Sequence, residues 1–143
     1  MNEDTVLLLR ECDAGIKTAM NSIREVLGNI DSATLRKGLT DSLNKHEYMG
    51  KEIAAILERQ GEEGKDPNPM ARMMSWAKTN MKLMENPQDT TVAKLMFEGC
   101  GMGIEKVSSY LNQYTDADER SREIALRLIR TEEELQSFLK NYV

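Results

Sequence analysis

Hydrophobic residues recur along most of the chain with the alternating three- and four-residue spacing of helices that bury one face. Over residues 4–28 this seam contains one carboxylate, and its members are Val6, Leu9, Asp13, Ile16, Met20, Ile23 and Leu27. Over residues 32–60 the seam contains a hydroxyl and an imidazole, and its members are Leu35, Leu39, Ser42, His46, Met49, Ile53 and Ile56. We therefore expect two long helices, each with polar side chains facing inward.

The connection between these two helices is short. Gly28 and Asn29 end the first periodic segment, and the side chain of Asp31 or Ser32 can cap the next one. Gly61 is a suitable helix stop. Two helices of similar length joined by a short turn pack as antiparallel neighbours.

A second pair of helices is predicted over residues 90–114 and 116–142, with Asp89 or Thr90 as the cap of the first. The inward positions of the last helix are Ile124, Leu128, Thr131, Leu135, Phe138 and Tyr142. The middle of the preceding helix contains Gly99, Gly101 and Gly103, each of which costs about 1 kcal/mol relative to alanine. We expect close approach of a neighbouring helix to offset this cost.

Residues 61–69 form a linker, after which Pro69 can open a helix over 69–85. One side of that helix is rich in methionine, with Met70, Met73, Met74, Ala77, Met81 and Met84. Thioethers can bind copper(I), and such a helix can simply cover the bundle, but an adaptable dimer contact is the favoured interpretation. The whole pattern predicts an all-α four-helix bundle over residues 1–143, made of two antiparallel hairpins and a long crossover containing a short extra helix.

The amino-acid composition argues against two classes of function, nucleic-acid binding and membrane insertion. The chain has 143 residues and a net charge of −5, without a basic stripe, so we expect no binding to nucleic acid. Apolar residues nowhere run to membrane-spanning length, and the acidic start lacks the basic region of a signal peptide. We therefore expect a cytoplasmic protein that does not enter membranes. Cys12 and Cys100 both fall in apolar stripes and are expected to be buried free thiols.

The helical layout resembles the ferritin-like superfamily. More narrowly, it resembles uncharacterised bacterial four-helix-bundle proteins that carry only a domain-of-unknown-function label. The residues behind this resemblance are Asp13, Leu57-Glu58-Arg59-Gln60-Gly61, Trp76 with Lys78, and Phe97-Glu98-Gly99. The resemblance implies the fold and raises the question of an iron or manganese site between the helices.

In metal-binding ferritin-like proteins, two helices each supply a Glu and the other two each supply a Glu-x-x-His motif. Here the second helix keeps His46 but lacks the acid, and the fourth keeps Glu132 but lacks the histidine. With Asp13 and Glu98 from the first and third helices, four of the six expected ligands are present. The candidate metal ligands are therefore Asp13, His46, Glu98 and Glu132, with iron or manganese as the cofactor.

The hairpin registers place Asp13 near the level of His46, and Glu98 near the level of Glu132. The two pairs are then separated by roughly 10 Å along the bundle, too far for a shared pair of ions. Asp13 and His46 are ligands of one metal, or a buried hydrogen-bonded pair that fixes helix register, or residues that make no contact with each other. The hydrogen-bonded pair is the favoured interpretation. Glu98 and Glu132 either bridge a metal or are neutralised by a cation, for which the candidates are Arg10, Lys17 and Lys94.

The sequence predicts no catalytic residue. The one histidine, His46, already has a nearer candidate partner in Asp13, and no second histidine is present to activate either cysteine. The clustered glycines lie in a predicted helix and not in a phosphate-binding loop after a strand. The favoured hypothesis is a non-enzymatic bundle with a degenerate or absent metal site, acting as a homodimer or through a protein partner. The alternative is a metal-dependent oxidase or iron-handling protein that uses the four candidate ligands.

Overall fold

The structure is a computed structural model that describes residues 1–67 and 88–143. Within these ranges the chain is all-helical, with helices α1 (Glu3–Leu27), α2 (Ala33–Arg59), α4 (Asp89–Gln113) and α5 (Glu119–Leu139). The prediction of an all-α bundle of four long helices is confirmed. The helix expected over 69–85, with its methionine-rich side, lies outside the described residues.

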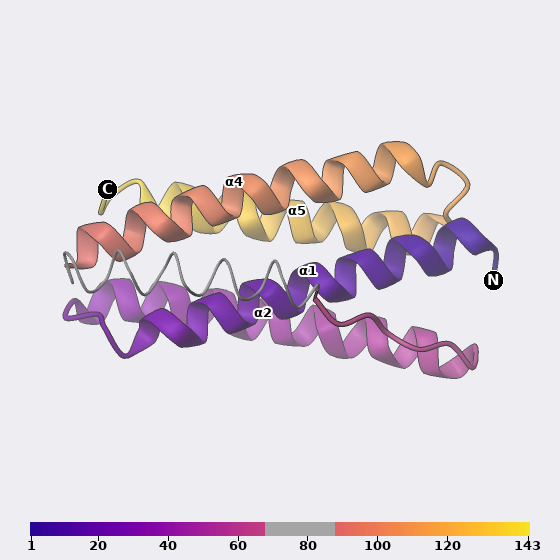
Figure 1. Cartoon of the computed structure of the whole chain (residues 1–143), viewed down its shortest axis with the longest axis horizontal. Helices are drawn as coiled ribbons and strands as arrows, with labels where there is room; N and C mark the ends of the chain where they lie inside the picture. Colours follow the sequence, from indigo (N-terminus) through magenta and orange to yellow (C-terminus); the bar gives the residue numbers. More distant parts are fainter. Residues whose placement is uncertain (68–87) are drawn as a thin grey trace.

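The four helices form two antiparallel hairpins packed side by side (Figure 1). Each helix contacts two neighbours around the bundle, in the order α1, α2, α5, α4, and α1 also contacts α5 across the core. Helices α1 and α5 run in one direction, whereas α2 and α4 run in the other (Figure 1). As a result, α2 ends and α4 begins at opposite ends of the bundle.

Local sequence determines where the helices begin and end. The Asn2 side chain accepts a hydrogen bond from the N–H of Thr5, and Ser32 caps α2 by accepting from the N–H of Leu35. Helix α2 ends before Gly61, which has a φ of +69° in the left-handed region that glycine favours. Helix α5 begins three residues later than predicted because Asp118 caps it by accepting from the N–H of Ser121.

Helix α4 differs from the expectation at its N-terminus. Asp89 is its first residue, and the preceding Gln88 makes no capping hydrogen bond through its side chain. The Asp89 carboxylate instead accepts hydrogen bonds, both 2.9 Å long, from the backbone N–H groups of Asp31 and Ser32. This carboxylate therefore joins the second hairpin to the turn of the first.

The apolar core consists of two clusters, one toward each end of the bundle. The first includes Leu8, Leu9, Ile16, Ile53, Ile124 and Leu128, and the second includes Ile23, Val26, Leu35, Leu39, Val92 and Leu139. On two neighbouring helices, the buried positions between the residues of one cluster and those of the other are polar. These positions are Ser42 and His46 in α2, and Thr131 and Glu132 in α5. The middle of the bundle is therefore a polar layer between two apolar ones.

Candidate functional site

The polar layer centres on a pair of side chains that joins the two hairpins. Atom Nε2 of His46, in α2, lies 2.5 Å from Oε1 of Glu132, in α5. His46 is fully buried and Glu132 is 7 % exposed. His46 belongs to the predicted seam of α2, whereas Glu132 is not a member of the predicted seam of the last helix and lies next to one, Thr131. The sequence pattern therefore places only the imidazole in the core.

Both ring nitrogens of His46 are occupied. Atom Nδ1 lies 2.8 Å from the backbone carbonyl oxygen of Ser42, which only accepts hydrogen bonds, so Nδ1 carries a proton. Burial by itself lowers the pKa of the His46 imidazole, but the hydrogen bond to Glu132 and its negative charge outweigh burial and raise this pKa above 6.5. Protonated His46 then donates one hydrogen bond to Ser42 and one to Glu132.

Two residues of α4 pack against Glu132. The thiol of Cys100 has a raised pKa because it is buried, because the charge of Glu132 opposes ionisation, and because it hydrogen-bonds to that carboxylate. A Cβ atom at Gly103 would lie 3.7 Å from the Glu132 carboxylate, an ordinary contact distance. The sequence prediction placed neither residue beside Glu132; only the position of Cys100 in an apolar stripe indicated that it faces inward.

Asp13 lies in a different environment from His46. Its carboxylate accepts a 2.9 Å hydrogen bond from the backbone N–H of Lys65 and forms a 2.9 Å ion pair with Lys17. The expected contact between Asp13 and His46 is therefore replaced by other partners for both residues. The reason is geometric: Asp13 faces the chain that follows α2, whereas His46 faces α5.

The segment that Asp13 contacts, residues 62–66, lies along α1, and we refer to it as the strap. Arg10 donates hydrogen bonds to the Glu63 carbonyl, at 2.7 Å, and to the Glu62 carboxylate, at 2.9 Å. Further along α1, Lys17 pairs with Asp66 at 3.1 Å. Side chains three and four residues apart on α1, those of Arg10, Asp13 and Lys17, therefore hold successive residues of the strap.

Glu98 is the remaining candidate ligand, and its side chain is exposed on α4. Glu132 is buried and contacts His46 and Cys100, so the two carboxylates differ in environment. A Cβ atom at Gly99, the residue after Glu98, would meet no neighbouring atom within 4 Å. This part of α4 therefore does not show the close helix approach that the glycines led us to expect.

The arrangement of donors can be compared with what a metal centre requires. Metal–nitrogen and metal–oxygen bonds near 2 Å hold neighbouring ligand atoms about 3 Å or more apart, whereas the Nε2 and Oε1 atoms are 2.5 Å apart. In residues 1–67 and 88–143, no three His, Cys, Asp or Glu side chains are grouped so that they could hold a metal ion. As arranged here, the candidate ligands fit an ion pair and a strap anchor, and they do not fit a two-metal centre.

Comparison with family models, curated proteins and solved structures found no match to this chain. None of the four helices described above is both long enough and apolar enough to cross a membrane.

Proposed function

We propose that this chain is a non-enzymatic, ferritin-like helical bundle that acts in the cytoplasm through self-assembly, as a homodimer, or through a protein partner. The observation that supports this proposal is the closed pairing of His46 with Glu132 and the Ser42 carbonyl. Groups that would bind a metal or a substrate are instead used to join α2 to α5. The pair of His46 and Glu132 then fixes the register of α2 against α5, a role that inward polar residues have in other bundles.

The surface supports a role in binding other proteins. Tyr48 in α2 is 67 % exposed, the highest value among the large hydrophobic side chains of the described residues. One turn further along α2, Glu52 forms a 2.6 Å ion pair with Arg127 of α5. Tyrosine and arginine are enriched in protein interfaces because each combines a large contact area with hydrogen-bonding groups.

The first experiment is a measurement of metal uptake. Untagged protein is incubated with ferrous iron or manganese, desalted, and assayed for bound metal and for oxygen-dependent iron oxidation. We expect no stoichiometric binding and no oxidation above the buffer rate. One or two bound ions per chain, lost in a His46→Ala variant, would overturn the proposal and favour the metal-dependent alternative.

The second experiment addresses assembly. Sedimentation equilibrium over a range of concentrations is carried out on the wild type, on Tyr48→Glu and on Met102→Glu. Met102 in α4 is 59 % exposed and serves as the matched control for a charge placed at an exposed apolar position. We expect a dimer that is weakened by the Tyr48 substitution and unaffected by the Met102 substitution. A monomer at all concentrations would leave binding of a different protein as the only form of the proposal.

A further inference from the structure

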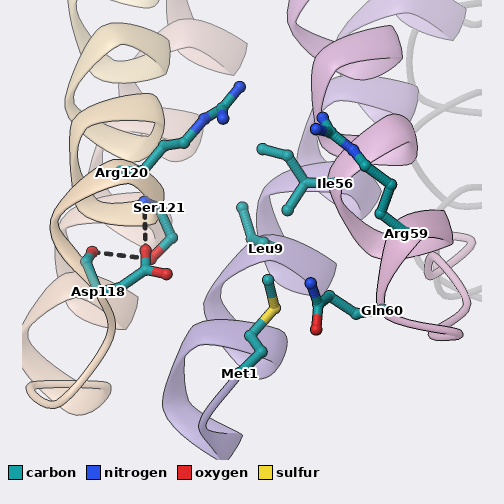
Figure 2. Close-up of a pocket in the computed structure, with 8 residues that line it drawn as sticks. All are labelled: Met1, Leu9, Ile56, Arg59, Gln60, Asp118, Arg120 and Ser121. Atoms are coloured by element: carbon teal, nitrogen blue, oxygen red, sulfur yellow. Dashed lines mark hydrogen bonds between the residues drawn. The ribbon is translucent and has the colours of Figure 1, made fainter.

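A pocket of about 180 Å³ opens at the end of the bundle where α1 and α5 begin and α2 ends (Figure 2). Three apolar residues line it: Leu9 in α1 and Ile56 in α2, which are 1 % and 8 % exposed, and Met1, which is 50 % exposed. An apolar cavity of roughly 150 Å³ is large enough for benzene. The pocket therefore has room for an apolar group about the size of one ring.

Two arginines lie at the same end of this pocket. Figure 2 shows the guanidinium groups of Arg59, from α2, and Arg120, from α5, on either side of Ile56. Within the described residues Arg120 has no hydrogen bond or ion pair, and Arg59 uses only its Nε atom, which donates to the Ala55 carbonyl at 3.3 Å. Both guanidinium groups are therefore available to a ligand.

One acidic residue also lines the pocket. Oδ1 of Asp118 accepts the 2.8 Å hydrogen bond from the N–H of Ser121 that caps α5. Its negative charge opposes that of an anionic ligand, whereas Arg59 and Arg120 favour one. Removing the charge of Asp118 should therefore strengthen the binding of an anion, whereas removing the charges of Arg59 and Arg120 should weaken it. The direction of each change in affinity indicates the charge of the ligand.

We propose that this pocket binds a small carboxylic acid with an apolar body. The body packs on Leu9 and Ile56, and the carboxylate lies at the guanidinium groups of Arg59 and Arg120. The planar guanidinium group matches the geometry of a carboxylate and can donate two parallel hydrogen bonds to it. An apolar floor beside unpaired arginines favours a ligand with both features over a purely apolar or a purely ionic one.

The test is a titration of the full chain with benzoate, followed by calorimetry or by NMR. Benzyl alcohol keeps the ring without the charge, and acetate keeps the charge without the ring. We expect benzoate to bind at least about tenfold more tightly than either, which corresponds to about 1.4 kcal/mol. The double variant Arg59→Gln/Arg120→Gln is expected to weaken benzoate binding about tenfold or more.

Two further variants make the test specific. Arg130→Gln removes an exposed arginine ten residues further along α5, about 15 Å from Arg120, and is expected to leave the affinity unchanged. Asp118→Asn keeps an N-cap side chain and removes the negative charge, so benzoate should bind more tightly. Equal affinities of the wild type and the double arginine variant would overturn the proposal. So would the absence of benzoate binding at millimolar concentration, or benzyl alcohol binding as tightly as benzoate.

Discussion

The ring of Phe138 in α5 occupies the space that a side chain at Gly38 in α2 would fill. A Cβ atom at Gly38 would overlap both Cε2 and Cζ of that ring. The glycine that a side chain of a neighbouring helix packs against most tightly is therefore in α2, not among the glycines of α4 where the sequence predicts tight packing. There, a Cβ atom at Gly101 would come no closer than 3.4 Å to a neighbouring atom, and Gly99 faces open space.

A matched pair of alanine substitutions tests this difference. Gly38→Ala should lower the free energy of unfolding by about 1–3 kcal/mol, because the ring of Phe138 must move and overpacking outweighs the better helix propensity. Gly99→Ala adds a methyl group to open space and should raise the free energy of unfolding by up to about 1 kcal/mol. Urea denaturation followed by circular dichroism measures both, and a stabilised Gly38→Ala variant would contradict this packing of Phe138.

The pair of His46 and Glu132 leads to a prediction about non-additivity. Glu132→Met leaves His46 buried without its partner and should cost about 3 kcal/mol of unfolding free energy. His46→Leu likewise leaves a buried carboxylate unpaired. The double variant His46→Leu/Glu132→Met removes both polar groups and should be more stable than either single variant. Additive losses in the double variant, measured by urea denaturation, would show that the two residues do not act as a pair.

The same pair predicts how stability changes with pH. The pKa of His46 is raised in the folded state from its ordinary value of 6.5. A raised pKa means that the folded protein binds the proton more tightly than the unfolded chain does. The stabilisation is therefore fully present below about pH 6.5 and is lost as the pH rises through the folded-state pKa.

Unfolding free energies measured from about pH 5 to about pH 8 test this prediction. The control is the double variant His46→Leu/Glu132→Met, in which the other titrating groups are unchanged. The wild type should lose stability relative to the control as the pH rises. A difference between the two proteins that stays constant, or that grows with pH, would contradict a charged His46 in the folded state.

The two cysteines are predicted to be unreactive in the native protein. Both are buried free thiols, as expected from the sequence. Burial and the charges of Glu11 and Asp13 raise the pKa of Cys12 to about 12, and burial and Glu132 also raise that of Cys100. Because the thiolate is the reactive form, a thiol reagent such as Ellman's reagent should modify neither residue near neutral pH until denaturant is added. Rapid modification of either thiol in the folded state would contradict the packing around it.

Much of the fold was predictable because helical periodicity fixes which side chains face inward. Both polar members of the α2 seam, Ser42 and His46, are buried as predicted. The partners of the polar residues were less predictable. Register arithmetic within a hairpin gives the level of a residue along the bundle, but it does not say which neighbouring helix the residue faces. For this reason the sequence predicts Asp13 of α1 as the partner of His46, whereas the structure pairs His46 with Glu132 of α5.

Asp13 shows a second limit of sequence-based reasoning. Its position in the α1 seam correctly indicated burial, and Asp13 is 5 % exposed. However, its hydrogen-bond donor is the backbone N–H of Lys65, a group that is present at every residue except proline and leaves no trace in a side-chain pattern. Only the path of the strap along α1 shows that this carboxylate holds a loop.

The role of Asp13 as the anchor of the strap can be measured at the hydrogen bond itself. Asp13→Ala removes the acceptor of the Lys65 N–H and one of the two carboxylates that pair with Lys17. A hydrogen bond to a charged group contributes about 1.5–3 kcal/mol, so the Lys65 amide should exchange with solvent roughly 10- to 100-fold faster.

Asp66→Asn is the matched control for Asp13→Ala, because Asp66 contacts the same lysine but its side chain is 90 % exposed, where ion pairs contribute little. We expect hydrogen exchange at Lys65 to be almost unchanged in the Asp66 variant, and equal acceleration in both variants would assign the strap's attachment to Lys17 rather than to Asp13.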